Sequence, residues 1–342
     1  MLIMVLAAVL ATGCQQAKFF ENPVINADVP DPSVVRIGTT YYAAGTSGNK
    51  QQVYPTFKSE NLVDWQPTGH IFNGWPAWTD GAFWAPELFV HNGKTLCYYT
   101  ARGKADGISC IGVASADAPD QPFTDHGPLV KWTNEAIDAF VFNDNGNGND
   151  NDNGNDNDNG NRNDNGNKTL ESTLYITWKA YGLDPSRPIE LLASRLSADG
   201  LRLEGEPFSL LCDDEDLGME GQCIFYHAPY YYILYAARDC CSPKSDYEVR
   251  VARAKRFEGP YEKYEGNPIL RGDGKDIQSC GHGTLVSTPK GRLYYLCHAY
   301  QQGRYNEGRK PILQELIIGK DGWPHFKTGE ITISRQPMPN VK

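Results

Sequence analysis

The sequence predicts an all-β fold, a five-bladed β-propeller, and three observations lead to this prediction. First, the 342 residues include 19 Tyr, 13 Phe and 7 Trp, which favour strands, and 34 Gly and 22 Pro, which favour turns. Second, no long stretch repeats apolar residues at the i, i+3, i+4, i+7 spacing of an amphipathic helix. Third, one sequence template occurs five times, and internal repeats indicate repeated structural units.

Each repeat opens with a polar or aromatic cluster, continues as a short apolar strand, turns at Gly, Asn or Pro, and returns as a strand rich in Tyr. The five repeats begin at Asp31, Trp84, Ile137, Glu220 and Gly281. A second template, an alternating strand followed by a turn and an aromatic residue, follows each of the first four. Two hairpin-like units provide four strands, which make one propeller blade, so five repeats predict five blades.

The spacing of the repeats is regular except at one insertion. Equivalent residues of successive repeats are 53, 54, 82 and 62 residues apart. The longest interval contains residues 143–168, 26 residues made almost only of Asn, Asp and Gly, and 56 residues remain without them. Such a tract has no apolar surface to bury, so we expect it to be disordered. Its DNDNG stretches are similar to a calcium loop, but the terminal Glu of an EF-hand is absent, which favours simple repeat expansion.

The N-terminal residues 1–17 form a separate unit ahead of the predicted propeller domain at 18–342. The apolar stretch Leu2–Ala11 is far shorter than the roughly 20 residues of a membrane-spanning helix, and we interpret it as an export signal. The segment LATG before Cys14 resembles the lipobox of a bacterial lipoprotein, although no Lys or Arg precedes the apolar run. We therefore expect acylation at Cys14 and location in the periplasm or at the cell surface. The alternative is an ordinary cleaved secretory peptide.

Charge and cysteine content narrow the possible partners. The chain has 32 basic and 42 acidic residues, a formal net charge of −10, and no cluster of Lys and Arg, which argues against a nucleic-acid partner. Neutral partners such as sugars suit this surface. Cys97, Cys223 and Cys297 lie in apolar strand patterns and are expected to be buried thiols. No C-x-x-C motif occurs, and the connectivity of the adjacent Cys240 and Cys241 stays open.

The repeats also predict where the functional site lies. In a propeller the first strand of each blade lines the central channel, so residues at equivalent blade openings converge at one end of the axis. These residues are Asp31, Trp84, Asp138, Glu220 and His282. Paired carboxylates suggest cleavage of a glycosidic bond, in which a protonated acid serves the leaving oxygen and a carboxylate activates water. The acid must stay protonated near neutral pH, and a third carboxylate beside it serves that purpose.

The strings NPVINADVPDPSVVR, WAPELF, AIDAFVF, MEGQCIFYH and CGHGTLV, with HAY and DGWP near the end, resemble the blade-opening motifs of glycoside hydrolase family 43. Members of that family are five-bladed propellers that invert the anomeric centre. The resemblance implies that Asp31 is the general base and Glu220 the general acid. It implies further that Asp138 tunes the pKa of the acid and orients it.

The same resemblance suggests roles for three more residues. Trp84 and Arg309 correspond to positions that often line the sugar site. His282 matches the histidine that in many members holds a calcium or sodium ion through the channel, in this chain through water. The sequence departs from the family pattern at Ala139 and Gln222, where Pro is common, which leaves the substrate subclass open. Asp28, close to Asp31, is interpreted as structural.

The sequence therefore predicts an exported, lipid-anchored, inverting glycosidase that releases L-arabinofuranose or D-xylose from plant-type polysaccharides or their oligosaccharides. Its chemistry needs no cofactor, although a structural calcium in the central channel is expected. Its only membrane contact is the lipid at Cys14. Two alternatives stay open: release of galactofuranose or galactose, and a non-catalytic carbohydrate-binding surface lipoprotein.

Overall fold

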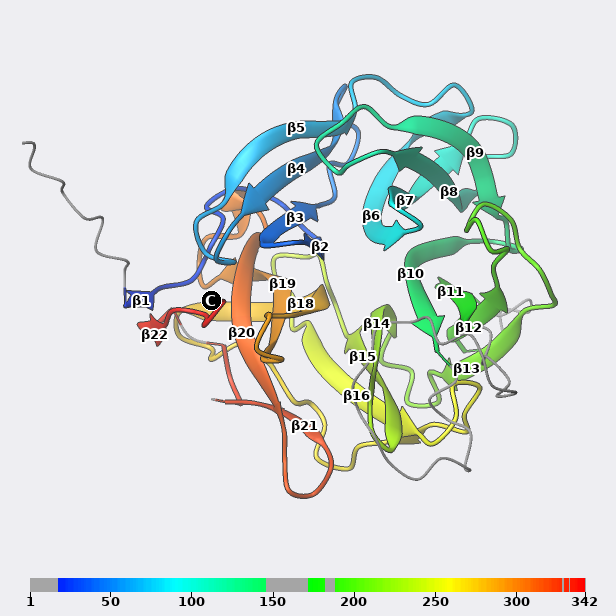
Figure 1. Cartoon of the computed structure of the whole chain (residues 1–342). Coiled ribbons are helices and arrows are strands. Elements are labelled where there is room, and N and C mark those ends of the chain that lie inside the picture. Colours follow the sequence, from blue (N-terminus) through cyan, green and yellow to red (C-terminus); the bar gives the residue numbers. More distant parts are fainter. Residues whose placement is uncertain (1–17, 146–171, 182–187, 328, 332, 342) are drawn as a thin grey trace, which may run out of the picture.

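The computed structural model describes residues 18–145, 172–181, 188–327, 329–331 and 333–341. Over these residues the strands form five four-stranded sheets arranged around a central axis (Figure 1). Each sheet is made of four consecutive antiparallel strands, so each corresponds to one sequence repeat. The prediction of a five-bladed propeller is confirmed.

The blades follow one another along the chain, each from its inner to its outer strand. The first contains β2 (Ser33–Ile37), β3 (Thr40–Ala44), β4 (Val53–Ser59) and β5 (Gln66–Phe72). The second contains β6 (Thr79–His91), β7 (Lys94–Gly103), β8 (Ser109–Ala116) and β9 (Thr124–Val130). The third contains β10 (Ala136–Asp144), β11 (Thr173–Ala180), β12 (Glu190–Arg195) and β13 (Phe208–Cys212).

The last two blades have the same order of strands. The fourth contains β14 (Glu220–His227), β15 (Tyr230–Ala237), β16 (Glu248–Ala254) and β17 (Glu262–Lys263). The fifth contains β18 (Ile277–Ser287), β19 (Leu293–Gln301), β20 (Lys310–Ile318) and β21 (Pro324–Phe326), with the short 3-10 helix η1 (Tyr305–Glu307) before β20. The second template was recognised only in the first four repeats, so β20 and β21 were missed by the sequence analysis.

Segments near the two described ends of the chain pair with each other, and the first of them bonds the fifth blade. Strand β1 (Phe19–Phe20) pairs with β22 (Gln336–Pro337) in a separate two-stranded sheet. After β1, the Asn22 side chain donates to Leu313 O at 3.1 Å and accepts from Leu313 N at 2.9 Å. The backbone of Val24 donates to Pro311 O at 3.0 Å. The segment before the first blade is therefore tied to strand β20 of the last.

Hydrophobic side chains fill the space between neighbouring blades. Tyr98 and Trp178, both fully buried, belong to a cluster that joins the second and third blades. Tyr231 and Tyr295 belong to a larger cluster across the third, fourth and fifth blades. Burial of such a side chain contributes roughly 1.5–3 kcal/mol to the stability of the fold, so these clusters stabilise the packing of each blade against its neighbours.

The described residues contain five buried thiols, one half-buried thiol at Cys212, and one disulfide. Cys97, Cys223 and Cys297 are at most 1% exposed, which confirms the expectation for all three. Cys240 and Cys241 are bonded to each other rather than to other strands. They lie in the turn between β15 and β16.

The insertion starts later than the sequence suggested. We expected it to begin at Asn143, but Asn143 and Asp144 still belong to β10 and pair with Leu174 and Thr173 of β11. The ladder is formed by backbone groups, so polar side chains do not end it. The rest of the tract for which we expect disorder, residues 146–168, lies outside the described residues. The expected export signal and Cys14 also lie outside them. Over the described residues, no helix has the length and apolarity needed to cross a bilayer.

Candidate active site

All five blade openings meet in one cavity, as the repeat alignment predicted. The cavity has a volume of about 280 Å³. It is lined by Asp31, Trp84, Glu135, Ile137, Asp138, Lys179, Tyr181, Glu220, Cys240, Cys241, His282 and Arg309. The three carboxylates predicted to be the base, the acid and the residue that tunes the acid, with the Trp and Arg predicted to bind substrate, are therefore gathered at one place.

Irregular backbone at the blade openings positions these side chains. Asp31, Asp138 and His282 have positive φ angles of 52°, 58° and 42°, a conformation that is uncommon for residues other than glycine. The pairing of β10 with β11 shifts register around Asp138, and that of β18 with β19 shifts around His282. Such bulges bend a strand and redirect a side chain, here toward the channel.

Gly221 and Gln222, which follow Glu220, lie against the third and fifth blades. Gly221 has a φ of 59°, and a Cβ at this position would lie 2.6 Å from Cγ of His282, so only glycine fits. The Gln222 amide donates to Asp138 O at 2.5 Å and to Thr177 Oγ1 at 3.1 Å. Gln222, which departs from the family pattern, thus anchors the backbone at Asp138.

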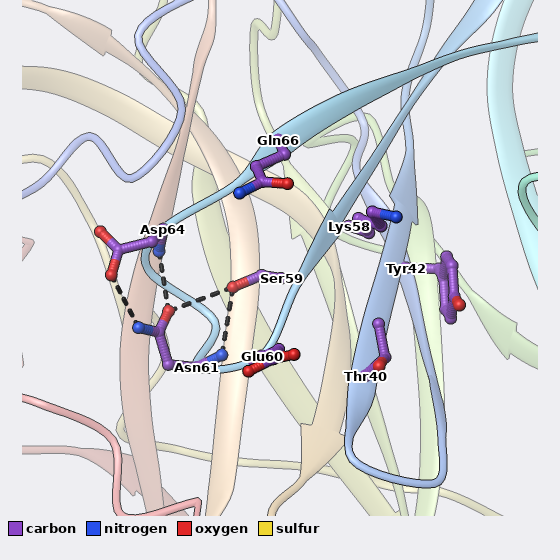
Figure 2. Close-up of a pocket in the computed structure, with 8 residues that line it drawn as sticks. All are labelled: Thr40, Tyr42, Lys58, Ser59, Glu60, Asn61, Asp64 and Gln66. Atoms are coloured by element: carbon purple, nitrogen blue, oxygen red, sulfur yellow. Dashed lines mark hydrogen bonds between the residues drawn. The ribbon is translucent and has the colours of Figure 1, made fainter.

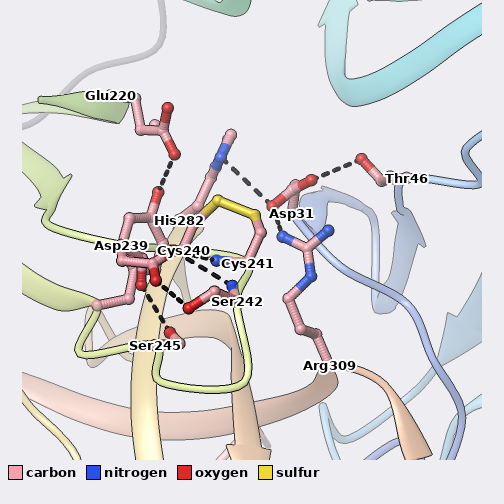
Figure 3. The surroundings of a disulfide bond; sticks show 12 residues. Asp31, Thr46, Glu220, Asp239, Cys240, Cys241, Ser242, Ser245, His282 and Arg309 are labelled. Carbon is pink, nitrogen blue, oxygen red and sulfur yellow. Dashed lines mark hydrogen bonds and ion pairs between the residues drawn. A yellow bond between two sulfur atoms is a disulfide. The ribbon is translucent and has the colours of Figure 1, made fainter. Parts of the chain in front are cut away.

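Asp31 is surrounded by hydrogen-bond donors and cations. Its Oδ2 accepts a hydrogen bond from Thr46 Oγ1 at 2.6 Å (Figure 3). Its Oδ1 lies 3.1 Å from His298 Nδ1, 3.4 Å from Arg309 Nη1 and 3.5 Å from His282 Nδ1. Burial raises the pKa of Asp31, but Arg309 and His282 outweigh it and hold the pKa well below the ordinary value. Asp31 is therefore an ionised carboxylate.

Asp138 and Glu220 form a second group, in which the proton is on Asp138. Burial, together with the charges of Glu220 and Asp31, raises the pKa of Asp138 to about 7. Burial also raises the pKa of Glu220, but Lys179, with smaller effects of His282 and Tyr247, outweighs burial, so the pKa of Glu220 lies below its ordinary value. Lys179 Nζ lies 2.7 Å from Glu220 Oε2, and Tyr247 donates to Glu220 Oε1 at 2.8 Å. We had expected the raised pKa on Glu220, and Lys179 is the reason for the difference.

The buried charges of the cavity balance. Asp31 and Glu220 are negative, Lys179 and Arg309 are positive, and the raised pKa keeps Asp138 protonated up to about pH 7. An isolated buried charge costs several kcal/mol, so pairing and protonation both reduce the desolvation penalty. As a result, Asp31 is ionised, and the Asp138–Glu220 pair opposite it holds one proton.

Two histidines contact Asp31, although the sequence analysis gave a role only to His282. Nδ1 of His282 also lies 3.7 Å from Asp138 Oδ2, so this ring sits between the two aspartates. His298 is 1% exposed, accepts a hydrogen bond from the backbone N of Asp31 at 3.0 Å and stacks on Tyr247. Burial and the charge of Arg309 lower the pKa of His298 to about 4, so it is neutral.

The two residues predicted to bind substrate, Trp84 and Arg309, have different surroundings. Trp84 is 39% exposed in the cavity and presents a free aromatic surface. Arg309 lines the cavity but is also the ion-pair partner of Asp31. Asp28 accepts a hydrogen bond from Arg309 N at 2.9 Å, which agrees with the structural role expected for Asp28.

The repeat alignment gave no signal for Lys179 and Tyr181 of the cavity or for Tyr247, which bonds Glu220, because none of them lies on an inner strand. Lys179 is on β11, Tyr181 follows β11 and Tyr247 precedes β16. The HAY string was part of the resemblance, but its first residue, His298, was given no role.

A second pocket lies on the outer part of the first blade (Figure 2) and does not share these features. It is lined by Thr40, Tyr42, Lys58, Ser59, Glu60, Asn61, Asp64 and Gln66. Three of its polar residues bond one another within a turn: Asn61 Oδ1 accepts from Ser59 Oγ and from the backbone of Asp64, and the Asn61 amide donates to Asp64. This pocket contains no group of buried carboxylates.

Comparison with known proteins gives a family match over most of the chain. The model described as Glycosyl hydrolases family 43 matches residues 20–165 and 164–324. The chain is 26% identical to the extracellular exo-α-(1→5)-L-arabinofuranosidase ArbA of Cellvibrio japonicus (strain Ueda107), over 95% of this chain and 91% of that protein. It is 25% identical to a xylan 1,3-β-xylosidase of Vibrio sp over 94% of this chain, but spans only 60% of that enzyme's length.

Solved structures show the same fold. The crystal structure of a thermostable family-43 glycoside hydrolase superposes with a TM-score of 0.78 at 26% sequence identity. The match covers 94% of this chain and 100% of the other. The whole ring of blades is therefore shared, and not only the cavity.

The role of Lys179 in the proton balance can be tested directly. We expect Lys179→Met to raise the pKa values of Glu220 and Asp138, because the ammonium group lowers both. The side-chain carboxyl carbons, followed by ¹³C NMR as a function of pH, report both titrations. Lys94→Met, which removes an ammonium from an exposed pair with Asp117, is the control and should leave them unchanged. Unchanged titrations in folded Lys179→Met protein would contradict this electrostatic account.

Proposed function

We propose, from the premise that the chain belongs to glycosyl hydrolases family 43, that it releases L-arabinofuranose or D-xylose from arabinan- or xylan-type carbohydrates with inversion at the anomeric carbon. That it is a glycosidase follows from the family. The choice of sugars is supported by the names of two relatives, one an arabinofuranosidase and the other a xylosidase. The catalytic roles of individual residues are also part of the proposal.

One observation carries the mechanism: the cavity holds carboxyl groups whose pKa values are shifted in opposite directions. Asp31 has a lowered pKa and Asp138 a raised one. An inverting glycosidase needs a carboxylate that accepts a proton from water and a carboxylic acid that donates one to the leaving oxygen. Groups with pKa values pushed apart in one site fit these two tasks.

Asp31 acts as the general base. Its negative charge persists at neutral and mildly acidic pH, because Arg309 and His282 stabilise it. Thr46 donates to the carboxylate and fixes its orientation, and His298 accepts from the backbone N of Asp31 and holds the main chain. As the oxygen of a water molecule attacks the anomeric carbon, one of its protons passes to Asp31.

Glu220 acts as the general acid, and Asp138 holds the proton of the pair before reaction. For transfer, Glu220 must carry this proton, and its contact with Lys179 opposes that. A substrate that draws Lys179 Nζ away from Glu220 Oε2 would raise the pKa of Glu220 and favour protonation. The reaction therefore needs Asp31 ionised and the Asp138–Glu220 pair protonated, so kcat/KM falls as the pH rises through about 7.

A structural ion in the central channel remains part of the proposal, outside the reaction itself. The described residues include no group of three or more His, Cys, Asp or Glu side chains that could hold a metal, so such an ion would bind mainly through water. Nε2 of His298 is buried without a hydrogen-bond partner and would suit a water molecule of that kind. His282, the residue we expected to hold the ion, faces Asp31 and Asp138.

The catalytic assignments are tested by removing each carboxylate. Asp31→Ala and Glu220→Ala should each lower kcat on the best nitrophenyl glycoside of a panel by about 10²–10⁴-fold, the usual contribution of a general acid or base. Asp117→Ala, which removes an exposed carboxylate, is the control. Circular dichroism verifies that each variant is folded. Rates like those of the wild type in either catalytic variant would refute the assignment.

The stereochemical outcome tests the role of Asp31. If Asp31 is a base, a water molecule must fit between Asp31 and the sugar. The two carboxyl groups therefore lie roughly 6.5–9.5 Å apart in inverting enzymes, against about 5–5.5 Å in retaining ones. We expect proton NMR to show that the first-formed product has the opposite anomeric configuration to the substrate. A first product with the substrate's own configuration would make Asp31 a nucleophile, and the mechanism would be wrong.

We also propose export and acylation at Cys14, from the apolar segment and lipobox-like residues before it. The relative from Cellvibrio japonicus is named as extracellular, which supports export but not a lipid anchor. Labelled palmitate should be incorporated into the wild-type protein in bacterial cells and not into Cys14→Ala. Equal labelling of both proteins, or none in the wild type, would contradict the anchor.

A further inference from the structure

The disulfide between Cys240 and Cys241 forms part of the wall of the active-site cavity. Both residues line the cavity, and Figure 3 shows the disulfide beside Glu220, His282, Asp31 and Arg309. The position is unusual for cysteine in this chain. The free cysteines among the described residues are buried, apart from half-buried Cys212, whereas Cys240 is half-buried and Cys241 is exposed.

The chemistry of a disulfide contrasts with that of most of the cavity wall. Eight of the twelve lining residues carry ionisable groups that can hydrogen-bond sugar hydroxyls; they are Asp31, Glu135, Asp138, Lys179, Tyr181, Glu220, His282 and Arg309. A disulfide has no hydrogen-bond donor, and its sulfur atoms are polarisable and weak acceptors. Sugar-binding sites need both kinds of surface, because a sugar ring has hydroxyl groups around its edge and C–H groups on its faces.

The segment that carries the disulfide is held in a fixed conformation. Asp239 Oδ1 accepts hydrogen bonds from Cys241 N at 3.0 Å and Ser242 N at 3.2 Å. Tyr305 OH, from η1 of the fifth blade, donates to Cys241 O at 2.8 Å. Ser245 Oγ donates to Asp239 O at 2.7 Å. With the two sulfurs bonded, neither side chain can rotate independently, so a ligand that packs on them costs little conformational entropy.

We propose that the Cys240–Cys241 disulfide is a substrate-binding surface, which packs against a C–H face of the sugar and thereby orients it between Asp31 and Glu220. This inference rests on the proposed function, because it assigns the apolar contact of the same site. It makes the disulfide a positioning element and leaves the proton transfers to the carboxylates. The competing explanation is a staple that only stabilises the turn between β15 and β16.

The first test compares the wild type with Cys240→Ala/Cys241→Ala on the best nitrophenyl glycoside of the panel. We expect kcat/KM to fall by at least tenfold, mainly because KM rises. The pH dependence of kcat/KM should not shift, because the carboxylates and Lys179 are unchanged. Cys212→Ala removes a thiol outside the cavity and is the matched control. A folded double variant with kcat/KM within twofold of the wild type, or with a displaced pH profile and unchanged KM, would overturn the inference.

The second test uses only the wild-type protein, so it holds even if the double variant does not fold. Tris(2-carboxyethyl)phosphine reduces a disulfide by attacking one sulfur, which breaks the S–S bond. Water then supplies oxygen to phosphorus, giving the phosphine oxide, and each sulfur takes a proton to become a thiol. Reduction of Cys240–Cys241 is followed by thiol alkylation and mass spectrometry, with and without saturating D-xylose or L-arabinose.

The sugar that inhibits the wild-type enzyme should slow this reduction at least fivefold, because it covers the sulfurs, and sucrose serves as the non-binding control. An unchanged rate of reduction with an inhibiting sugar present would overturn the inference and leave the proposed function intact. A wild-type protein that hydrolyses no glycoside of the panel would overturn the proposed function, and the inference with it.

Discussion

The gathering of three carboxylates, two buried and one partly buried, at one end of the propeller channel is the constraint on which the site depends. Asp31, Asp138 and Glu220 are each placed by a different blade, and their mutual repulsion is strong in a poorly solvated cavity. The structure meets this constraint with Lys179, Arg309 and one retained proton. The same balance leaves Asp31 ionised and one proton on the Asp138–Glu220 pair, which is the starting state of the mechanism we propose.

The backbone of the blade openings makes this arrangement possible. Positive φ angles at Asp31, Asp138 and His282, with register shifts in the inner strands, turn side chains out of the regular alternation of a strand. Gly221 permits the close approach of His282, and the Gln222 amide bonds the backbone beside Asp138. Because neighbouring blades supply these contacts, the site is completed only when the whole ring is closed.

The cavity combines a charged wall with smaller apolar surfaces, and the two kinds come from different parts of the blades. The carboxylates lie at the openings of inner strands, whereas Tyr181 and the Cys240–Cys241 disulfide lie in segments after second strands. Trp84 is an inner-strand residue that remains partly exposed. Turn segments tolerate sequence change more readily than inner strands.

The sequence alone determined the number of blades, the inner strands and the convergence of Asp31, Asp138 and Glu220, because strand periodicity and repeat spacing are local properties of the chain. It missed the outer strands of the fifth blade and placed the start of the insertion at Asn143, since backbone pairing continues under polar side chains. Only the tertiary structure brought Lys179 to Glu220, 41 residues away in sequence, and His298 to Asp31, 267 residues away. A pKa depends on charges and burial in three dimensions, so the location of the proton on Asp138 was decided by contacts between blades that no single repeat encodes.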